Sequence, residues 1–487
     1  MNPICIHPEN ERVFLFRGKP ALLLCATEHY GSVMNRPFDY RAYIEEAKDK
    51  LQNYTRLFLL FREQQIHCNP YSTCKPESPD YISPFMRVGP GKAKDGEPVY
   101  DVSAWNPEFF GRLTEFIGLA SDAGIVVEVV LFSNTYCDTV WDLNPLNSPN
   151  NVNGLEHSHW ADYNTLTHPK LNAVQERLVR KVVTELNGFD NIVFEPCNEP
   201  GGQFAPETAT VSQVNEWLEW VVSLIRETEA SLPNKHLIFG QEAFAYDPMT
   251  MTTTLSYEKK FPVDVVNVHP LPNTVLRGRS YDLGAFMSRE LKLSEMRDYC
   301  LAAGMEGKPL CFDEDNTASC YKDRDGWLIH RKRAWTTLMN LSHYDMIDFS
   351  IINYSPAGTP DSRANLRTWF KNLAKFVSAL PMEKAEAFMA QGCWEGDSAV
   401  VSAFSAGDAK YFYVADDTEL VFAKKPEYKP VKGALTFDLK PGDYLAYVYS
   451  PEAGVCSTAM KFTGGPGARV ELPPFYHDIA VCAVPVQ

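Results

Sequence analysis

The chain has 487 residues, a formal net charge of −16 and 45% hydrophobic residues. That apolar fraction is enough for a large buried core and argues against a disordered chain. The negative charge argues against nucleic acid and anionic membranes as partners. No stretch of about 18 uncharged apolar residues is present, so we expect no membrane span. The length predicts about two to three domains.

The first residues and the cysteines bear on location. Met1 to Pro8 contain neither a basic segment nor an apolar segment, so we expect no secretory signal. Several of the twelve cysteines, among them Cys25, Cys197 and Cys311, lie inside apolar runs. Such cysteines behave as small hydrophobes and do not suggest a disulfide framework. Both observations favour a reducing, cytoplasmic location.

Apolar runs recur along the chain from about Ala21 to about Ile352. Most are continuous and not alternating, which is typical of strands buried on both faces. Eight candidate strands follow in order: 21–26, 54–60, 125–132, 192–195, 237–240, 263–268, 310–314 and 346–352.

Helical patterns separate or follow these strands. The clearest begins with Asn106 and Pro107, a plausible N-cap and a proline at the first helical position, and ends at Gly124. The other candidates are 40–52, 171–186, 212–229, 252–261 (the weakest pattern), 286–303, 327–341 and 363–380. Alternating βα units in this number predict a (β/α)8 TIM barrel. The alternative, a doubly wound sheet, lacks a glycine-rich dinucleotide turn after the first strand.

The pattern changes after about Pro381. Short β-like runs with Gly and Pro turns replace the helices, at 399–404, 410–414, 435–439, 444–449, 470–472 and 479–484. This predicts a small antiparallel β-sandwich domain over residues 384–487, behind a barrel domain over residues 1–383.

Two of the predicted strands end in glutamates. Ile192 to Phe194 lead into a segment that closes with Asn198-Glu199-Pro200, and the run from Leu310 closes with Glu314. The proline cannot continue a sheet ladder, so the chain leaves the sheet just after Glu199. Catalytic groups of parallel barrels sit at the carboxyl ends of strands. Two glutamates there are what glycosidic bond cleavage needs.

These residues resemble clan A glycoside hydrolases, the TIM-barrel group that includes cellulases. The resemblance rests on Asn198-Glu199-Pro200 on the fourth strand, Glu314 on the seventh, Arg56 on the second and His269 at the end of the sixth. Arg12 to Pro20 resembles the small hairpin, at about residues 10–20, that plugs the bottom of such barrels.

The tail segment from Leu472 to Ala480 is similar to the end of a β-sandwich found behind some bacterial cellulase-like barrels and often labelled collagen-binding. One departure is visible at the eighth strand. Many clan members carry a sugar-stacking Trp there, whereas this chain offers Asn353 and Tyr354.

The resemblance implies a retaining hydrolase of small glycosides or oligosaccharides that uses two glutamates in a double displacement. Glu199 would be the general acid/base, with its pKa raised by burial and a neighbouring carboxylate. Glu314 would be the nucleophile, kept ionised by Arg56. Strand alternation lets only one of Asp313 and Glu314 face the site, and the resemblance favours Glu314.

Further residues are candidate contacts to a carbohydrate substrate. Asn198 would bind the sugar 2-hydroxyl, and His269 would orient the nucleophile or bind a hydroxyl. Two others, Glu28 and His29, follow the first predicted strand. Long loops span 61–106 and 133–168, and the second contains Asn134, Trp141 and Trp160. Tyr354 lies beside the eighth strand. Aromatic rings at such positions stack on sugars or simply pack a loop.

No metal or cofactor is expected. His157, His159 and His168 in one loop, and His67, Cys68 and Cys74 in another, lack the paired spacing of zinc sites. Two alternatives remain open: a metal-dependent lyase or isomerase using Glu199, His269 and Asp313, and a non-catalytic sugar-binding barrel. The sugar, linkage, anomer and oligomeric state are not encoded in any pattern we recognise.

Overall fold

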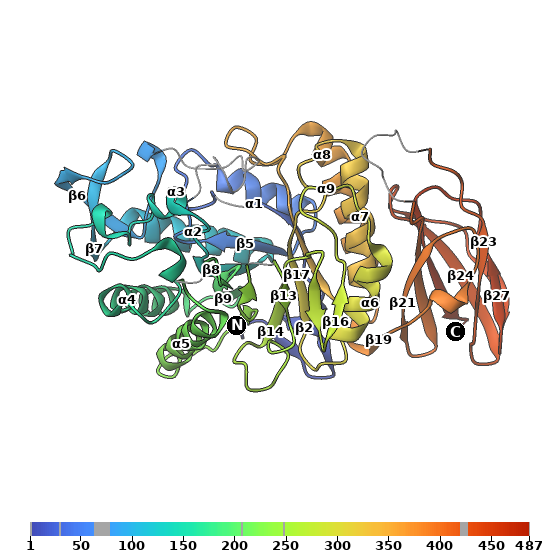
Figure 1. Ribbon diagram of the computed structural model, residues 1–487. Helices are drawn as coiled ribbons and strands as arrows, with labels where there is room; N and C mark the ends of the chain where they lie inside the picture. Colours follow the sequence, from blue (N-terminus) through green and yellow to red (C-terminus); the bar gives the residue numbers. More distant parts are fainter. Residues whose placement is uncertain are drawn as a thin grey trace.

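The computed structural model describes residues 2–28, 31–62, 78–205, 208–246, 249–418 and 427–486. Figure 1 shows an α/β part, coloured blue to orange, beside a smaller all-β part in orange and red. Among the described residues no helix is both long and apolar enough to cross a membrane.

Eight strands of the α/β part form two parallel sheets among the described residues. One sheet has the order β11-β14-β17-β18-β4 and the other the order β5-β8-β9. The strands are β4 (Leu24–Thr27), β5 (Tyr54–Phe58), β8 (Val126–Ser133), β9 (Ile192–Asn198), β11 (Phe239–Gly240), β14 (Val265–Val268), β17 (Leu310–Asp315) and β18 (His343–Ile347). Each overlaps one of the predicted strands, and the chain order is that of a (β/α)8 barrel.

The edges of the two sheets lie against each other at two seams. At one seam a parallel bridge joins Phe194 of β9 to Ile238, just before β11. At the other, the Asn53 side chain accepts a hydrogen bond from Leu24 N at 2.9 Å and donates one to Leu22 O at 2.8 Å. The Asn53 amide, together with a backbone hydrogen bond from Asn53 N to Leu24 O at 3.4 Å, thus joins β4 to β5 where no regular ladder forms.

Helices follow most of these strands. They are α1 (Tyr40–Asp49), α2 (Pro107–Ala123), α3 (Asp138–Trp141), α4 (Pro169–Leu186), α5 (Val211–Glu229), α6 (Leu293–Ala303), α7 (Arg324–Met339), α8 (Pro360–Ala364) and α9 (Leu366–Ser378). The predicted caps of α2 are present, because Asn106 accepts from Glu108 N and Gly124 adopts φ 75°.

Two helix predictions need correction. The helix expected at 252–261 is absent, and that segment holds the end of the short strand β13 (Met251–Thr252) followed by turns. The helix expected from Phe286 starts only at Leu293, after an Lys292 with φ 48°. At 252–261 the backbone pairs instead with β15 (Thr274–Leu276), where Thr253 N donates to Val275 O at 2.9 Å, so tertiary pairing overrides the weak helical pattern.

A small antiparallel sheet closes the amino ends of the barrel strands. It consists of β1 (Cys5–His7), β2 (Asn10–Phe16) and β3 (Lys19–Ala21). The ring of Phe14 in β2 is buried and stacks on His343 at 4.3 Å between centroids. This end of the barrel is therefore packed with apolar groups, which leaves the opposite end for a site.

Several connections carry short strands of their own. These are the hairpin of β6 (Phe85–Lys92) and β7 (Pro98–Trp105), the pair β10 (Gly201–Gly202) and β12 (Phe244–Ala245), and the sheet of β13, β15 (Thr274–Leu276) and β16 (Arg279–Tyr281). The sequence placed no strands in these loops.

The all-β part contains two antiparallel sheets with an apolar core of their own. The larger sheet contains β19 (Ala385–Phe388), β21 (Val400–Ala406), β22 (Ala409–Ala415), β28 (Asp478–Pro485), β24 (Gly442–Ser450), β25 (Val455–Cys456) and β26 (Met460–Gly464), and the smaller contains β20 (Trp394–Gly396), β23 (Gly433–Phe437) and β27 (Ala468–Glu471). Residues such as Val401, Phe412 and Leu435 fill the core. The arrangement is consistent with a sandwich.

Helix α7 lies between the two parts. Figure 1 shows it beside β21, and nearly all of its side chains are buried. Trp335 of α7 stacks on Tyr413 of β22 with ring centroids 5.2 Å apart. A helix that is buried on every side belongs to two layers at once, so the barrel and the sandwich share it.

Candidate active site

Glu199 and Glu314 lie at the carboxyl ends of two barrel strands. Glu199 directly follows β9, and Glu314 is the fifth residue of β17. Both have left-handed backbones, with φ 46° and 50°. That conformation costs a non-glycine residue about 1–2 kcal/mol, and such strain collects at functional sites. The surrounding structure therefore holds both glutamates in place.

His269, which directly follows β14, brings the two glutamates together. Its Nδ1 lies 3.0 Å from Glu199 Oε1 and 3.6 Å from Glu314 Oε2. An oxygen of each carboxylate lies within 4.8 Å of the other. This spacing matches retaining glycosidases, whose carboxyl groups lie about 5–5.5 Å apart, better than inverting ones at about 6.5–9.5 Å.

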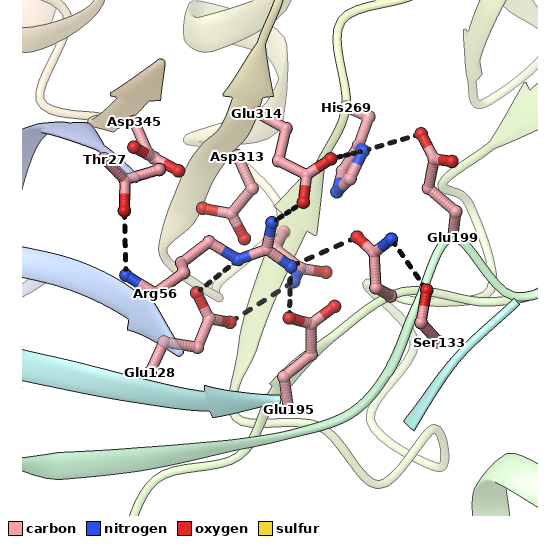
Figure 2. A network of polar contacts seen from close by, with 12 residues as sticks. Thr27, Arg56, Glu128, Ser133, Glu195, Glu199, His269, Asp313, Glu314 and Asp345 are labelled. Carbon is pink, nitrogen blue, oxygen red and sulfur yellow. Dashed lines mark hydrogen bonds and ion pairs between the residues drawn. The ribbon is translucent and has the colours of Figure 1, made fainter. Parts of the chain in front are cut away.

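The guanidinium of Arg56 in β5 contacts three carboxylates (Figure 2). Nη1 donates to Glu314 Oε1 and Nη2 donates to Glu195 Oε2. Nε lies 3.2 Å from Glu128 Oε2. Nη2 also donates to Asn198 Oδ1 at 3.2 Å. One buried cation therefore links the four strands β5, β8, β9 and β17.

Buried acids surround Arg56 below the two glutamates. Figure 2 shows Glu128, Glu195 and Asp313 around the guanidinium and Asp345 on the side of Thr27, and none of the four acids is measurably exposed. Burial raises the pKa of Glu128 and of Asp345 well above the usual range, with the charge of Asp313 adding to both. Burial also raises the pKa of Glu195, against the opposing charge of Arg56. One guanidinium cannot neutralise so many carboxylates, so part of this layer stays protonated.

The three groups at the mouth of the barrel titrate together. Burial disfavours the charged imidazole of His269, but Glu314 and the hydrogen bond to Glu199 outweigh it and raise its pKa to about 9. Burial also disfavours ionised Glu199, but the His269 hydrogen bond outweighs it and lowers the pKa of Glu199. Burial raises the pKa of Glu314 to about 7, although Arg56 and His269 oppose it.

These directions differ from the sequence-based expectation of a raised pKa at Glu199 and an ionised Glu314. Burial is the largest cause of the raised pKa at Glu314, and His269, whose positive charge lies nearer to Glu199 than to Glu314, lowers the pKa of Glu199. In the free site the proton needed for acid catalysis therefore sits on the imidazole, one hydrogen bond away from Glu199.

Tyr136, which the sequence analysis did not single out, completes the site. Its hydroxyl donates to Glu199 Oε2 at 2.6 Å and accepts from Asn198 Nδ2 at 3.0 Å. Asn198 also donates to Ser133 Oγ at 3.2 Å. The Asn198 amide is thus held between Arg56 and Tyr136, with its orientation fixed. Tyr136 lies in the loop after β8 with φ 57°. No sequence pattern predicts this backbone conformation, so the position of the Tyr136 hydroxyl could not be predicted.

The predicted sugar contacts after the first and third strands are placed as follows. Glu28 is buried and accepts from Ser32 N at 2.9 Å and from Ser32 Oγ at 2.6 Å, so it shapes the turn after β4. His29 lies outside the described residues. Asn134 is buried, and its Oδ1 accepts from Tyr136 N at 3.2 Å. Its Nδ2 has no hydrogen-bond partner among the described residues, which leaves a donor for a ligand.

The three predicted aromatic contacts differ in exposure. Trp141 is 3% exposed and donates from Nε1 to Ser158 O, so it packs its loop and is not positioned to stack on a sugar. Trp160 is partly buried against Phe204, with ring centroids 4.6 Å apart. Tyr354 is 89% exposed, so any sugar that it touches lies at the outer rim.

Alternation along β17 fails at the site. Phe312 pairs with Tyr344 and Asp315 with Met346, so three steps along β17 oppose two along β18. This bulge turns both Asp313 and Glu314 toward Arg56, as Figure 2 shows. The expectation that only one of them faces the interior is therefore wrong.

Glu199, His269 and Glu314 are also a group that could hold a metal ion, because one ligand atom from each lies within 4.8 Å of the others. Two carboxylates and one imidazole suit a divalent cation. In the present arrangement, however, His269 Nδ1 already contacts both carboxylates. The loop histidines His157, His159 and His168 belong to no such group among the described residues.

Paired glutamates at the carboxyl ends of two strands of a parallel α/β barrel are typical of clan A glycoside hydrolases. A family model described as cellulase (glycosyl hydrolase family 5) matches residues 81–354, more than half of the chain. The chain belongs to this family. It is a retaining glycoside hydrolase, and the resemblance to clan A is confirmed.

Solved structures similar to this chain show the same fold. A glycoside hydrolase family 5 protein from Bacteroides vulgatus ATCC 8482 is 12% identical with a TM-score of 0.61, covering 100% of this chain and 95% of its own. A further protein from that strain is 14% identical with a TM-score of 0.63, covering 100% and 82%. Another glycoside hydrolase is 12% identical with a TM-score of 0.61, covering 99% and 97%. No curated protein matches the chain.

The buried acid layer predicts how stability depends on pH. A carboxyl group whose folded pKa is raised stabilises the fold below its unfolded pKa of about 3.9, and this stabilisation is lost as pH rises through the folded value. Asp345→Asn mimics the protonated acid and removes this dependence. Between pH 5 and pH 8 the variant should lose less unfolding free energy than the wild type, by up to about 1.4 kcal/mol for each pH unit over which Asp345 is protonated only in the folded state.

Urea unfolding at several pH values measures this difference. The exposed Asp361→Asn serves as the control for losing one carboxylate. Parallel stability curves for Asp345→Asn and the wild type would show that Asp345 is ionised in the fold.

Proposed function

We propose that Glu314 is the nucleophile and Glu199 the general acid/base of a double displacement at O-glycosidic bonds. The observation that carries this assignment is the shared contact of both carboxylates with His269 Nδ1, at 3.0 and 3.6 Å, which fixes them at a retaining spacing. The left-handed backbones at both positions support it.

The first displacement forms a glycosyl-enzyme ester. Glu314 attacks the anomeric carbon with one carboxylate oxygen, and the bond from that carbon to the leaving oxygen breaks. Glu199 gives its proton to the leaving oxygen. In the second displacement Glu199, now a carboxylate, takes a proton from water as the water oxygen attacks the anomeric carbon and releases Glu314.

Arg56 prepares the nucleophile. Its contact with Glu314 favours the carboxylate, which burial alone would protonate. Because the same guanidinium also holds Glu195 and Asn198, Glu314 remains only partly neutralised and keeps its nucleophilic oxygen. Asn198 is oriented to bind the sugar hydroxyl next to the anomeric carbon.

His269 supplies the proton that Glu199 donates. A charged imidazole next to ionised Glu199 has the same number of protons as a neutral imidazole next to protonated Glu199. Binding of a sugar displaces water from the partly exposed Glu199, whose side chain is 25% exposed. Desolvation disfavours the ion pair over the neutral pair, so the proton moves from Nδ1 to the carboxylate as the substrate binds.

The substrate class follows from access to the nucleophile. The Glu314 side chain is only 4% exposed, so a sugar ring must enter deeply before its anomeric carbon meets the carboxylate. We propose that the enzyme acts on small glycosides or oligosaccharides in the cytoplasm and releases terminal residues. The sandwich then supports the barrel and does not anchor a polymer.

The metal-dependent alternative was predicted on Glu199, His269 and Asp313, whereas the three described residues that lie close enough together for an ion are Glu199, His269 and Glu314. A divalent ion held by Glu199, His269 and Glu314 would make turnover sensitive to chelators, whereas two-glutamate hydrolysis continues in excess EDTA. The second alternative, a non-catalytic sugar-binding barrel, predicts sugar binding without turnover by the wild-type chain.

Substitution of the two glutamates separates their roles. Glu314→Ala should abolish turnover of aryl glycosides, and added azide should give a glycosyl azide of inverted anomeric configuration. Glu199→Ala should lower kcat by about 10²–10⁴ for poor leaving groups and spare activated aryl glycosides, because those need little proton donation. Azide with this variant should give the retained configuration.

The exposed Glu219→Ala is the matched control and should leave kcat unchanged. Equal losses on good and poor leaving groups for Glu199→Ala would show that Glu199 is not the acid. Initial rates and NMR of the azide products provide both readouts.

The pH dependence of kcat/KM tests whether His269 holds the proton that Glu199 donates. Activity should rise as Glu314 ionises near its pKa of about 7 and fall as the His269–Glu199 pair loses its proton near about 9. His269→Asn removes the positive charge beside Glu199, so the alkaline limb should move to lower pH. An alkaline limb that stays in place in His269→Asn would rule out this role.

Product analysis tests the proposed mode of attack. With an oligosaccharide of about five sugars, the monosaccharide should accumulate from the first time point, because the buried nucleophile admits a chain end. Early formation of mid-length fragments, or binding of the isolated residues 384–487 to an insoluble polysaccharide, would contradict the proposal.

A further inference from the structure

The residue after the nucleophile is fixed from outside the barrel. The bulge in β17 turns Glu314 inward with φ 50°, and Asp315 points to the opposite side, toward α7. Asp315 is fully buried. A left-handed glutamate persists only where its neighbours over-determine the backbone, so the contacts of Asp315 hold the backbone of Glu314 while Arg56 and His269 contact its side chain.

Asp315 is held by a ring of donors. Arg333 of α7 donates from Nε to Oδ2 at 2.6 Å and from Nη2 to Oδ1 at 3.1 Å. Tyr344 donates its hydroxyl to Oδ2 at 2.7 Å, and Ser319 donates to the backbone carbonyl at 3.0 Å. A bidentate guanidinium contact fixes both the distance and the plane of the carboxylate.

The same helix is fixed on its other face by the sandwich. Arg331 donates from Nε and Nη2 to the two carboxylate oxygens of Asp478 at 3.0 and 2.7 Å. Tyr413 donates to Asp478 as well, at 2.9 Å, and Lys332 donates to Asp416 O at 2.7 Å. Arg331 and Lys332 are each 1% exposed, so without these partners two buried charges would be uncompensated.

We propose that Arg333 is a positioning residue for Glu314. We also propose that the C-terminal sandwich keeps Arg333 in place, because Asp478 binds Arg331 of the same helix α7. The sandwich, α7, Asp315 and the nucleophile then form one continuous set of buried contacts. This inference rests on the proposed function of Glu314. It gives the sandwich a part in catalysis without any sugar contact.

His269 provides a readout that does not require turnover. The charged groups that act on its imidazole are Glu314 of β17, Glu199 directly after β9, Arg56 of β5 and, more weakly, Glu195 of β9. If Glu314 moves away, the imidazole loses a negative neighbour 3.6 Å from Nδ1 and titrates at lower pH. The NMR titration of His269 in full-length protein therefore reports the position of the nucleophile.

Three variants test the proposal: Asp315→Asn, Asp478→Asn and, as a milder change, Tyr344→Phe, which removes a single donor to Asp315. The control is Arg324→Ala, because Arg324 also joins α7 to the sandwich but through an exposed contact with Glu452. Near-UV circular dichroism establishes that each variant is folded. Aryl glycoside kinetics give kcat and KM separately.

We expect the His269 midpoint to fall in Asp315→Asn and Asp478→Asn and to stay in place in Arg324→Ala. We expect kcat to fall about 10- to 100-fold in Asp315→Asn, as for a reactive group misplaced by about 1 Å, with KM little changed. Asp478→Asn should show a smaller loss in kcat, again with KM little changed. Tyr344→Phe should lie between the wild type and Asp315→Asn.

Two results would overturn the inference. An unchanged His269 midpoint in folded Asp315→Asn, or in Tyr344→Phe where Asp315→Asn does not fold, would remove the positioning role. A shift in Asp315→Asn with none in Asp478→Asn would remove the part of the sandwich. A wild-type protein that hydrolyses no glycoside would instead refute the proposed function. The His269 titration would still test whether the sandwich, α7 and Asp315 position Glu314.

Discussion

The buried guanidinium of Arg56 is the interaction on which the rest of the site depends. It joins Glu314, Glu195 and Glu128, which come from three different barrel strands, and it also fixes Asn198. Removing a buried charge from such a network typically costs about 3–5 kcal/mol, because the partners are left uncompensated. The barrel interior is therefore held by the same contact that sets the ionisation of the nucleophile. Stability and catalysis share one residue.

Much of this arrangement could be predicted from the sequence, because the signals are local. Continuous apolar runs mark strands buried on both faces, and a proline directly after Glu199 marks where β9 leaves the sheet. Arg56 was predicted from the resemblance to clan A barrels, which often carry an arginine on the second strand. Glu128 and Glu195 also sit in apolar runs, and because a buried cation has to meet a buried anion, those runs could have identified them as its partners.

Other features depend on contacts between distant residues and were not predictable. The bulge that aims Asp313 and Glu314 the same way arises from the pairing of β17 with β18, so strand alternation gave the wrong orientation. Tyr136 reaches Glu199 from an irregular loop. Trp141 looked like a sugar contact by residue type, but its loop folds over it. Periodicity describes one element at a time, whereas these positions are set by two or three.

The left-handed backbones of Glu199 and Glu314 have a consequence for evolution and engineering. Glycine adopts this conformation without the roughly 1–2 kcal/mol of strain that a side chain brings, and loses about 0.5–1 kcal/mol in unfolded-chain entropy. Backbone strain alone would thus favour glycine at both places, and the glutamates persist because their contacts and activity outweigh the strain. A Glu314→Gly scaffold would lose that strain together with one carboxylate partner of Arg56, and it would have no nucleophile. Such a scaffold suits the reverse task of building glycosidic bonds from activated donors.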